Sequence, residues 1–377
     1  MKIVYCIASV YNPGGMERVL LNKLRWWVGR GGCELLVVTT DQAGRPPFYA
    51  FPEQVRMTDL GIGYSADNGR HPVAKIFSYF RKRRLHRCRL SELLYREKAD
   101  IVVSLYPSES SFIPDIKDGS RKVLELHYCK FFRLQYGRRG LLGLADRFRT
   151  WQDGRIVRRF DSFVVLTQQD AGFWGALPNL SVIPNAALAA PAAEHREGTR
   201  RVIAVGRLDY QKGFDRLISA WALLPEPYRS SWRLDIFGQG EWRERLQAQI
   251  DGLGLARTVR LNAPTKRIME EYAESEFLVM SSHYEGFPMV MIEAMSCGLP
   301  VVSFDFLCGP ADIIRTEENG LIVPDGDVKG LSDAMLRLME NRSALHRMSL
   351  AARRVSETYS ENAIMTRWER LFNDIIQ

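Results

Sequence analysis

The stretch Glu285-Gly-Phe-Pro-Met-Val-Met-Ile-Glu293 carries most of the information about fold and function. Pro288 lacks an amide proton and suits the first turn of a helix, so the stretch predicts a loop that contains Glu285 and a helix that begins near Pro288. Glu293 then lies about one and a half turns into that helix, at roughly 1.5 Å of rise per residue. The stretch therefore places two carboxylates at a junction between a loop and a helix.

The backbone N–H groups of Gly286, Phe287 and Met289 are expected to point out of the N-terminus of this helix, where the helix dipole favours a phosphate or another anion. A glutamate in the first turns of a helix is common for purely structural reasons, and this would explain Glu293 alone. It does not explain Glu285 before Gly-Phe-Pro. Two carboxylates with open amides between them predict a receptor for a sugar phosphate.

The residues that follow extend this pattern. Ala294-Met-Ser-Cys-Gly-Leu-Pro300 and the apolar run Val301–Phe304 predict the end of a helix, a glycine stop and a buried parallel strand. The whole segment resembles the donor-site signature of family 4 retaining glycosyltransferases. The resemblance implies an α/β chain of the GT-B fold, with two Rossmann-like doubly wound parallel-sheet domains facing a central cleft and a C-terminal helix that crosses back to the first domain.

A second motif, Val202-Ile-Ala-Val-Gly-Arg-Leu-Asp-Tyr-Gln-Lys-Gly-Phe214, predicts a short strand, a glycine turn and a helix. It matches the Gly-Arg-Leu-x-x-x-Lys-Gly pattern of the same family. When a nucleotide sugar reacts, a nucleoside diphosphate leaves, and preorganised cations and amides must stabilise its charge. Arg207 and Lys212 are the candidates, since arginine binds two phosphate oxygens and lysine acts as a point charge. The alternative is that both are solvated surface cations.

The start of the chain is similar to the same family. Lys2–Ala8 predicts a first strand, and Asn12-Pro-Gly-Gly-Met-Glu-Arg18 predicts the turn into a first helix. Backbone can approach a phosphate closely at such a glycine turn, although a Gly-Gly pair is more often only a turn. In related enzymes this loop faces the donor diphosphate and the acceptor, so Gly15 is a candidate donor-binding residue.

The length of 377 residues and the alternation of strand-like and helical stretches predict two domains with parallel sheets. We expect an N-terminal acceptor-binding domain in residues 1–186 and a linker in 187–200. A donor-binding domain in 201–358 and a terminal helix in 359–377 complete the expected organisation. The ligand cleft is expected between the two sheets.

His127 follows the strand-like residues Lys122–Leu126 and should stand at the C-terminal edge of a parallel sheet. A single histidine is usually structural. Its position matches that of a histidine that many related enzymes carry near the donor sugar, which implies that it orients a hydroxyl or stabilises developing charge. The resemblance further implies donor contacts from Ala263 and Pro264, in the loop after Val259–Leu261, and from Val290.

The net charge of +8 is concentrated in the predicted first domain, in residues 81–84 and in arginines within 133–159. We expect peripheral contact with an anionic membrane through residues 81–84 and 133–159, because aromatic and leucine residues interleave with the second group of arginines, although a solvated basic helix is the plain alternative. Nucleic acid is not expected, because no binding motif accompanies the charge. No stretch approaches the roughly 18 consecutive apolar residues of a membrane span, so we expect a cytoplasmic protein, peripheral at most on the inner face of the membrane.

No metal site is expected. The six cysteines lack the spacing of zinc ligands, and Asp325-Gly-Asp327 follows an apolar strand and predicts a turn rather than a metal-binding pair. Gly238-Gln-Gly240 lacks the third glycine of a dinucleotide fingerprint. We therefore expect no cofactor.

The resemblance implies metal-independent transfer of a hexose or N-acetylhexosamine with retention of anomeric configuration. A UDP-linked donor is favoured, and the acceptor is expected to be a glycan or a lipid-linked saccharide of surface polysaccharide or lipopolysaccharide. Glu293 would hold the ribose and Glu285 the transferred sugar, so both are expected to bind rather than to act as the acid and nucleophile of a glycosidase. Three alternatives stay open: a nucleotide-sugar epimerase, a glycogen-type phosphorylase on the same fold, and a non-catalytic module that binds a sugar nucleotide or a membrane.

Overall fold

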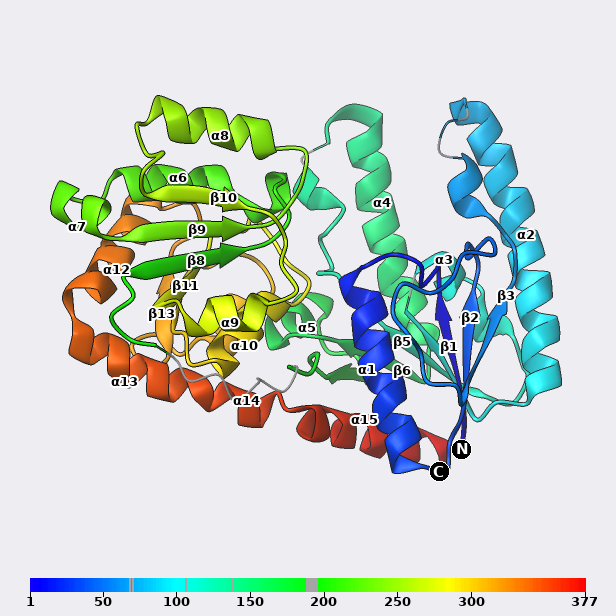
Figure 1. The fold of residues 1–377 in the computed structure, drawn as a ribbon. Coiled ribbons are helices and arrows are strands. Elements are labelled where there is room, and N and C mark those ends of the chain that lie inside the picture. Colours follow the sequence, from blue (N-terminus) through cyan, green and yellow to red (C-terminus); the bar gives the residue numbers. More distant parts are fainter. Residues whose placement is uncertain (68, 70, 106, 137, 188–195) are drawn as a thin grey trace. The chain divides into compact units, whose positions relative to one another are not determined.

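The computed structural model describes residues 1–67, 69, 71–105, 107–136, 138–187 and 196–377, and it divides into two compact units (Figure 1). The first unit comprises Met1–Leu166, Ala171–Ile183 and Met365–Gln377. The second unit comprises Thr167–Asp170 and Pro184–Ile364. Most of the expected linker, residues 188–195, lies outside the described residues.

The first unit contains a seven-stranded sheet in the order β3-β2-β1-β4-β5-β6-β7, with every neighbouring pair parallel. Its central strands are buried apolar runs, as expected for a parallel sheet covered on both faces. The strand order reverses between β1 and β4, which is the point where ligands bind in open α/β sheets. The strands are β1 (Lys2–Ile7), β2 (Glu34–Thr39), β3 (Val55–Asp59), β4 (Ile101–Ser104), β5 (Arg121–Glu125), β6 (Ser162–Val165) and β7 (Leu180–Val182).

Helices join these strands and cover the sheet. The α-helices are α1 (Gly15–Arg30), α2 (Pro72–Glu97), α3 (Pro107–Ser110), α4 (Gly140–Ile156) and α5 (Gln168–Trp174), and short 3-10 helices lie at η1 (Tyr64–Asp67), η2 (Ile113–Asp115), η3 (Leu134–Tyr136) and η4 (Val157–Arg159). The helix α1 follows β1 directly, as the Asn12–Arg18 turn predicts. The loop between β1 and α1 therefore lies at the carboxyl end of the central strand.

The terminal helix α15 (Glu361–Ile376) returns to the first unit, to which residues from Met365 onward belong. The rings of Trp27 and Phe372 stack with their centroids 5.7 Å apart. Arg30 Nε lies 3.1 Å from Glu369 Oε1. The expected return of the C-terminal helix to the first domain is therefore confirmed.

The second unit contains a six-stranded, fully parallel sheet in the order β10-β9-β8-β11-β12-β13. This order repeats that of the first six strands of the first unit, with a reversal between β8 and β11. The expected pair of doubly wound parallel sheets is confirmed. The strands are β8 (Arg201–Val205), β9 (Arg233–Phe237), β10 (Val259–Asn262), β11 (Phe277–Met280), β12 (Val301–Phe304) and β13 (Gly320–Val323).

Two groups of helices accompany this sheet. In one group α6 contacts both α8 and α12, in the other α10 contacts both α9 and α14, and α13 contacts α10, α12 and α14. The bounds are η5 (Tyr210–Lys212), α6 (Phe214–Ala222), α7 (Glu226–Ser231), α8 (Arg243–Gly252), α9 (Ile268–Ala273), α10 (Met289–Ser296), α11 (Pro310–Ile313), α12 (Val328–Glu340), α13 (Arg342–Arg353) and α14 (Val355–Thr358).

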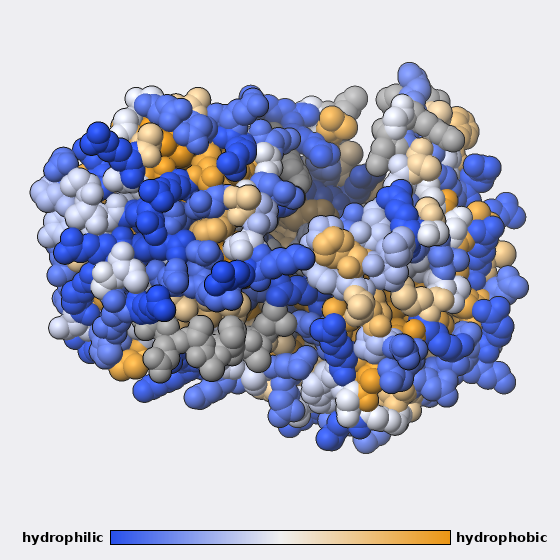
Figure 2. Space-filling model, viewed as in Figure 1, coloured by the Kyte–Doolittle hydropathy of each residue, from blue (hydrophilic) through white to orange (hydrophobic). Residues whose placement is uncertain are grey.

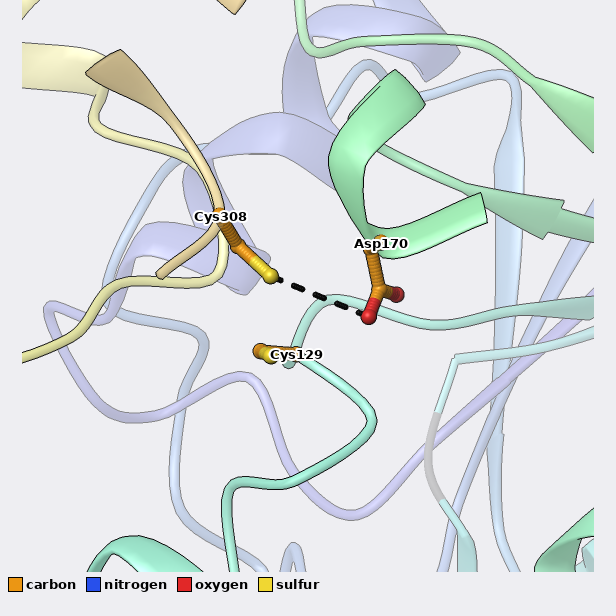
Figure 3. Close-up of side chains that lie close together, drawn as sticks. All are labelled: Cys129, Asp170 and Cys308. Atoms are coloured by element: carbon orange, nitrogen blue, oxygen red, sulfur yellow. Dashed lines mark hydrogen bonds between the residues drawn. The ribbon is translucent and has the colours of Figure 1, made fainter. Parts of the chain in front are cut away.

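The short segment Thr167–Asp170 belongs to the second unit through contacts with the loop before α11. Gln169 Oε1 accepts a hydrogen bond from the backbone N–H of Cys308 at 2.6 Å. Cys308 Sγ donates a hydrogen bond to Asp170 Oδ1 at 3.7 Å, and Figure 3 shows the two side chains pointing toward each other. A segment that is distant in sequence is thereby fixed to the second unit.

The surface seen in Figure 2 is mostly hydrophilic, with scattered hydrophobic residues. Within the described part of the chain, the structure contains no helix whose length and hydropathy suit a membrane-spanning segment.

Candidate active site

The candidate site of the second unit lies where the order of its sheet reverses. β8 and β11 are neighbours, and the loops that follow them, residues 206–213 and 281–288, leave the same edge of the sheet. Lys212 comes from the first loop and Glu285 from the second. A parallel sheet thus brings together two residues that are 73 positions apart.

Lys212 Nζ lies 2.5 Å from Glu285 Oε1, and both side chains are largely buried. Lys212 ends the short helix η5, whose first turn is capped by Asp209, since Asp209 Oδ1 accepts from Lys212 N at 3.3 Å. The ammonium group is therefore held at a defined position beside a carboxylate.

Two further side chains hold the carboxylate of Glu285. Ser282 Oγ donates to Oε1 at 2.8 Å, and Gln211 Nε2 lies 3.3 Å from Oε2. Gln211 Nε2 also donates to the carbonyl of Tyr284 at 3.1 Å, which joins the two loops. Only 7% of Glu285 is exposed, so its orientation is set by these contacts rather than by solvent.

Glycines let the loops approach closely. A Cβ added to Gly206 would lie 2.9 Å from Cδ and Cε of Lys212, so the lysine side chain runs across this residue. A Cβ at Gly238 would lie 1.8 Å from the carbonyl oxygen of Gly206. The Gly238-Gln-Gly240 motif therefore serves the packing of the β8 and β9 loops.

Arg207 lies at the entrance of the same loop and is 68% exposed. It donates to Gln211 Oε1 at 2.7 Å and lies 3.2 Å from Asp209 Oδ2. The rings of Tyr210, from the same loop, and His283 stack with centroids 4.2 Å apart. Burial and the nearby Arg216 guanidinium lower the pKa of His283.

The helix that the opening stretch predicts is α10, which begins at Met289 directly after Pro288. Glu293 is its fifth residue and is 8% exposed. Phe287 is buried and its ring lies 5.8 Å from that of Tyr359. The expectation of an open amide at Met289 is wrong, because Met289 N donates to the carbonyl of Phe287 at 2.9 Å in a tight turn.

The remaining donor-site candidates of the second unit lie at the same carboxyl edge or at the start of α10. Ala263 and Pro264 follow β10 and are exposed, whereas Gly286, Met289 and Val290 are half-buried. The candidates of this unit therefore lie in the loops that follow β8, β10 and β11 and in the first turns of α10.

The Asp325-Gly-Asp327 segment is a turn, as predicted. Asp325 Oδ1 accepts from Arg216 Nη1 at 2.8 Å, and Asp327 Oδ1 caps α12 by accepting from Gly330 N at 2.8 Å. Arg216 Nη2 also donates to the carbonyls of Ser281 and Ser282, at 2.6 and 2.7 Å. Arg216 thus supports the loop that carries Glu285.

Gly15 and His127 belong to the first unit. Gly15 is the exposed first residue of α1. His127 follows the end of β5 by two residues, and its Nε2 lies 3.2 Å from Glu125 Oε1. Both therefore lie at carboxyl ends of strands in their own sheet.

The basic residues of the first unit divide into paired and exposed ones. Lys82 is buried and lies 2.7 Å from Asp67 Oδ2, and Arg83 donates to Ser111 Oγ at 2.9 Å. Of residues 81–84, only Arg81 and Arg84 are exposed, so the expectation that this whole run faces a membrane is wrong. Arg133 and Arg159 form ion pairs with Asp153 and Asp115.

Several residues that hold the candidate site in place could not be predicted from the sequence. Gln211 and Ser282 hold Glu285, and Arg216 holds its loop, yet each is an ordinary polar residue in its segment. In the first unit, Glu125 could have been singled out from the sequence, since a carboxylate inside an apolar parallel strand is unusual. Its partner Lys23, on α1, could not have been recognised in the same way.

Comparison with known proteins identifies the second unit. Residues 189–355 match the family model described as Glycosyl transferases group 1. The second unit carries a group 1 glycosyltransferase domain. The motifs around Lys212 and Glu285 both lie inside the matched region of this glycosyltransferase domain.

Three relatives are similar in sequence to this chain. An exopolysaccharide phosphotransferase of Streptomyces coelicolor is 35% identical over 223 residues, 57% of this chain and 24% of that protein. The amylovoran biosynthesis glycosyltransferase AmsD of Erwinia amylovora is 31% identical over 228 residues, 56% of this chain and 62% of that protein. Both matches span less than two thirds of the relative. An uncharacterized glycosyltransferase of Haemophilus influenzae is 26% identical over 98% of this chain and 99% of its own length.

Solved structures share the fold over the full chain. TarM superposes with a TM-score of 0.79 at 17% identity and covers 99% of this chain and 98% of its own. HepE of Anabaena, solved in complex with UDP-glucose, gives a TM-score of 0.72 at 17% identity and covers 99% of this chain and 100% of its own. At this identity the likeness shows the fold, which is GT-B.

Proposed function

We propose that the chain transfers a hexose or N-acetylhexosamine from a UDP-linked donor, with retention of configuration and without a metal ion. The observation that carries the proposal is the contact between Lys212 Nζ and Glu285 Oε1 at the reversal point of the second sheet. It places a buried cation and a carboxylate where an open α/β sheet binds its ligand. The UDP-glucose complex of HepE supports the choice of donor.

In this proposal Lys212 and Arg207 stabilise the diphosphate as it leaves, since preorganised cations act where negative charge develops. The exposed guanidinium of Arg207 binds phosphate oxygens, and the carboxylate that holds Lys212 keeps its ammonium in place. Glu285 accepts hydrogen bonds from hydroxyls of the transferred sugar through the oxygen positions not taken by Lys212. Glu293 binds the ribose.

The acceptor hydroxyl attacks from the face that the diphosphate leaves, and a phosphate oxygen takes the proton. His127 orients a hydroxyl at the edge of the first sheet, and Gly15 leaves room for ligand in the loop before α1. The proposed donor contacts are completed by Ala263, Pro264, Gly286, Phe287, Met289 and Val290. The proposed acceptor is a glycan or lipid-linked saccharide of surface polysaccharide, in keeping with the polysaccharide biosynthesis named for AmsD.

We also propose that the first unit contacts an anionic membrane through α4. Leu142, Leu144, Phe148 and Trp151 of this helix are each more than half exposed. Arg155 stacks over the ring of Trp151 at 4.1 Å, and Arg147 is exposed on the same helix. Exposed aromatic and basic side chains on one helix suit an anionic lipid surface, which would place the protein peripherally on the inner face of the membrane.

The first test is thermal stabilisation of the purified protein by UDP, GDP, ADP and their hexose conjugates in the presence of a chelator. A ligand that binds only the folded state raises the melting temperature by mass action. We expect UDP to stabilise the protein and one UDP-sugar to add to the effect. Stabilisation by another nucleotide alone would reject the UDP donor, and a requirement for metal would reject the metal-free mechanism.

Product analysis then separates the alternatives. Transfer to a saccharide, with an α-linked donor giving an α-linked product, supports the proposal. Turnover of the UDP-sugar without an acceptor would indicate an epimerase, and turnover that needs inorganic phosphate would indicate a phosphorylase. Binding without turnover under any of these conditions would indicate a non-catalytic module.

A further inference from the structure

A buried charge cluster lies under His127 in the first unit. Glu125 ends β5, Lys23 comes from α1, and His127 follows β5 by two residues. Glu125 Oε1 lies 2.5 Å from Lys23 Nζ and 3.2 Å from His127 Nε2. One carboxylate oxygen therefore lies between an ammonium and an imidazole.

The cluster is almost closed to solvent. The side chains of Lys23, Glu125 and His127 are 6%, 1% and 5% exposed. Trp368 of α15 covers the ammonium, with Lys23 Nζ 3.7 Å from the centroid of its ring. Lys23 thus has a carboxylate on one side and an aromatic face on another, and the terminal helix takes part in holding it.

Glu125 is anionic in this environment. Burial alone would raise its pKa, but Lys23 and His127 outweigh burial and hold the pKa of Glu125 at about 2. Burial lowers the pKa of Lys23, and Glu125 opposes this. Burial also raises the pKa of Glu17, on the first turn of α1, while the charge of His127 opposes it.

A buried ion pair is rarely retained for stability, because desolvation of two charges offsets most of their attraction. An apolar pair would fill the end of β5 equally well, since Val123 and Leu124 beside Glu125 are buried and apolar. We therefore infer that the charged pair has a role other than packing. The group that Glu125 faces, besides Lys23, is the imidazole of His127.

The contact favours one tautomer of that imidazole through charge rather than through a hydrogen bond, because His127 Nε2 makes no hydrogen bond with the described residues although Glu125 Oε1 lies 3.2 Å away. A carboxylate oxygen presents only lone pairs, so at 3.2 Å it attracts an Nε2 that carries a proton and repels an Nε2 that carries a lone pair. In the neutral ring this nitrogen is Nε2, and Nδ1 is left as an acceptor. An acceptor at Nδ1 can bind the hydrogen of a hydroxyl group.

We propose that Lys23 and Glu125 form a positioning pair that fixes the orientation and the Nε2–H tautomer of His127, so that Nδ1 accepts a hydrogen bond from a substrate hydroxyl. The proposal rests on the proposed transferase function for the identity of that hydroxyl. The tautomer itself follows from the cluster alone. Lys23 and Glu125 act through His127 and do not contact the reacting atoms.

The test uses the full chain and the double variant Lys23→Met/Glu125→Leu, which removes both charges together and so leaves no buried ion unpaired. The matched control is Asp118→Leu/Lys122→Met, a second buried ion pair at the opposite end of β5. The tautomer is read from the imidazole nitrogen shifts of ¹⁵N-labelled protein, with the signals of His127 identified by their loss in His127→Gln. Unfolding is followed for each variant.

We expect wild-type His127 to be protonated at Nε2 and the double variant to populate both tautomers. With a UDP-sugar and acceptor, kcat should fall about 10²-fold in the double variant, in line with the cost of a misplaced catalytic group, while KM changes less than kcat. The control pair should keep both the tautomer and kcat. An Nδ1–H tautomer in the wild type, an unchanged tautomer in the double variant, or an equal loss of kcat in the control would each overturn the proposal.

If the double variant does not fold, Glu125→Gln gives the same answer. The amide oxygen can still face both groups, as Glu125 Oε1 does, but it carries no negative charge, so the preference for a proton on Nε2 weakens and the Nε2–H population of His127 should fall. An unchanged population would refute the positioning role. If the wild type shows no transfer with any donor, the proposed function fails, whereas the nitrogen shifts still decide whether the pair sets the tautomer.

Discussion

Lys212 and Glu285 are 73 residues apart in the chain, yet Lys212 Nζ lies 2.5 Å from Glu285 Oε1. The contact exists because β8 and β11 are neighbours at the reversal point of the second sheet, and each loop leaves its strand at the same edge. A lysine that is held by a carboxylate is oriented before any ligand arrives. This preorganisation is what a site for a departing anion requires.

Replacing Lys212 should therefore remove catalysis more than folding. We expect Lys212→Ala to lower kcat/KM by about 10²-fold or more, the usual cost of one preorganised donor. Lys329→Ala is the control, because Lys329 pairs with Asp333 on the surface of the same unit and is 67% exposed. Steady-state kinetics with a UDP-sugar would contradict the assignment if both variants behaved alike.

The glycine at position 206 should matter for the position of Lys212. In Gly206→Ala the new Cβ would meet Cδ and Cε of Lys212 at 2.9 Å, so the lysine side chain must move. Because the far end of a lysine is flexible, we expect stability to change by less than about 1 kcal/mol and UDP binding to weaken. Gly252→Ala, where nothing lies within 4 Å, is the control. Calorimetric titration with UDP measures the difference, and equal affinities in the two variants would show that Lys212 adapts freely.

The fold and the elements that carry the second-unit candidates were largely predictable, because the patterns that indicate them are local in the sequence. Pro288 sets the start of α10 through its missing N–H, and the apolar runs of β8 and β11 are those of buried parallel strands. The contacts that hold the site were not predictable. Gln211 and Ser282 act on Glu285 only after the sheet brings two loops together, and no pattern along the chain marks them. The same holds for Lys82, whose burial against Asp67 reverses the expected exposed basic run.

The buried His86 predicts a pH dependence of stability. Burial lowers its pKa to about 4, and its Nδ1 lies 3.2 Å from the hydroxyl of Tyr64. The unfolded chain, with a histidine pKa near 6.5, binds more protons than the folded one between about pH 6.5 and pH 4. The stability of the folded protein relative to the unfolded chain therefore falls by up to about 3 kcal/mol between about pH 6.5 and pH 4, because folding keeps His86 neutral while the unfolded chain binds the proton. Above about pH 6.5 this loss is absent.

The measurement is urea unfolding between pH 4 and pH 7. His86→Phe should flatten the part of the pH dependence that arises from this group. His346→Gln should leave that part unchanged, since His346 lies on the surface beside Glu197. An identical pH profile in the wild type and His86→Phe would show that folding does not shift the pKa of His86.

The terminal helix should be required for the stability of the first unit. Phe372 is fully buried and stacks on Trp27 with ring centroids 5.7 Å apart. We expect Phe372→Ala to lower the free energy of unfolding by about 3 to 5 kcal/mol, the usual cost of such a cavity. Ile376→Ala, at a residue that is 41% exposed, should cost less than about 1 kcal/mol. Similar denaturation midpoints for the two variants would mean that α15 contributes little to the first unit.

The exposed face of α4 makes the membrane proposal testable. Phe148 and Trp151 are 59% and 53% exposed on one helix, and Arg155 lies over Trp151. Membrane binding would combine two contributions: apolar side chains enter the lipid interface, and arginines contact anionic headgroups. Binding should therefore need both anionic lipid and the rings of Phe148 and Trp151. We expect Phe148→Ser/Trp151→Ser to weaken co-sedimentation with phosphatidylglycerol vesicles about tenfold or more, since each ring buried contributes about 1.5 kcal/mol or more. Leu350→Ser, which removes an equally exposed residue of the second unit, should bind as the wild type does. Equal binding to vesicles of phosphatidylcholine alone would show that anionic headgroups do not contribute to binding. Unchanged binding of the double variant would show that α4 is not part of the membrane-binding surface.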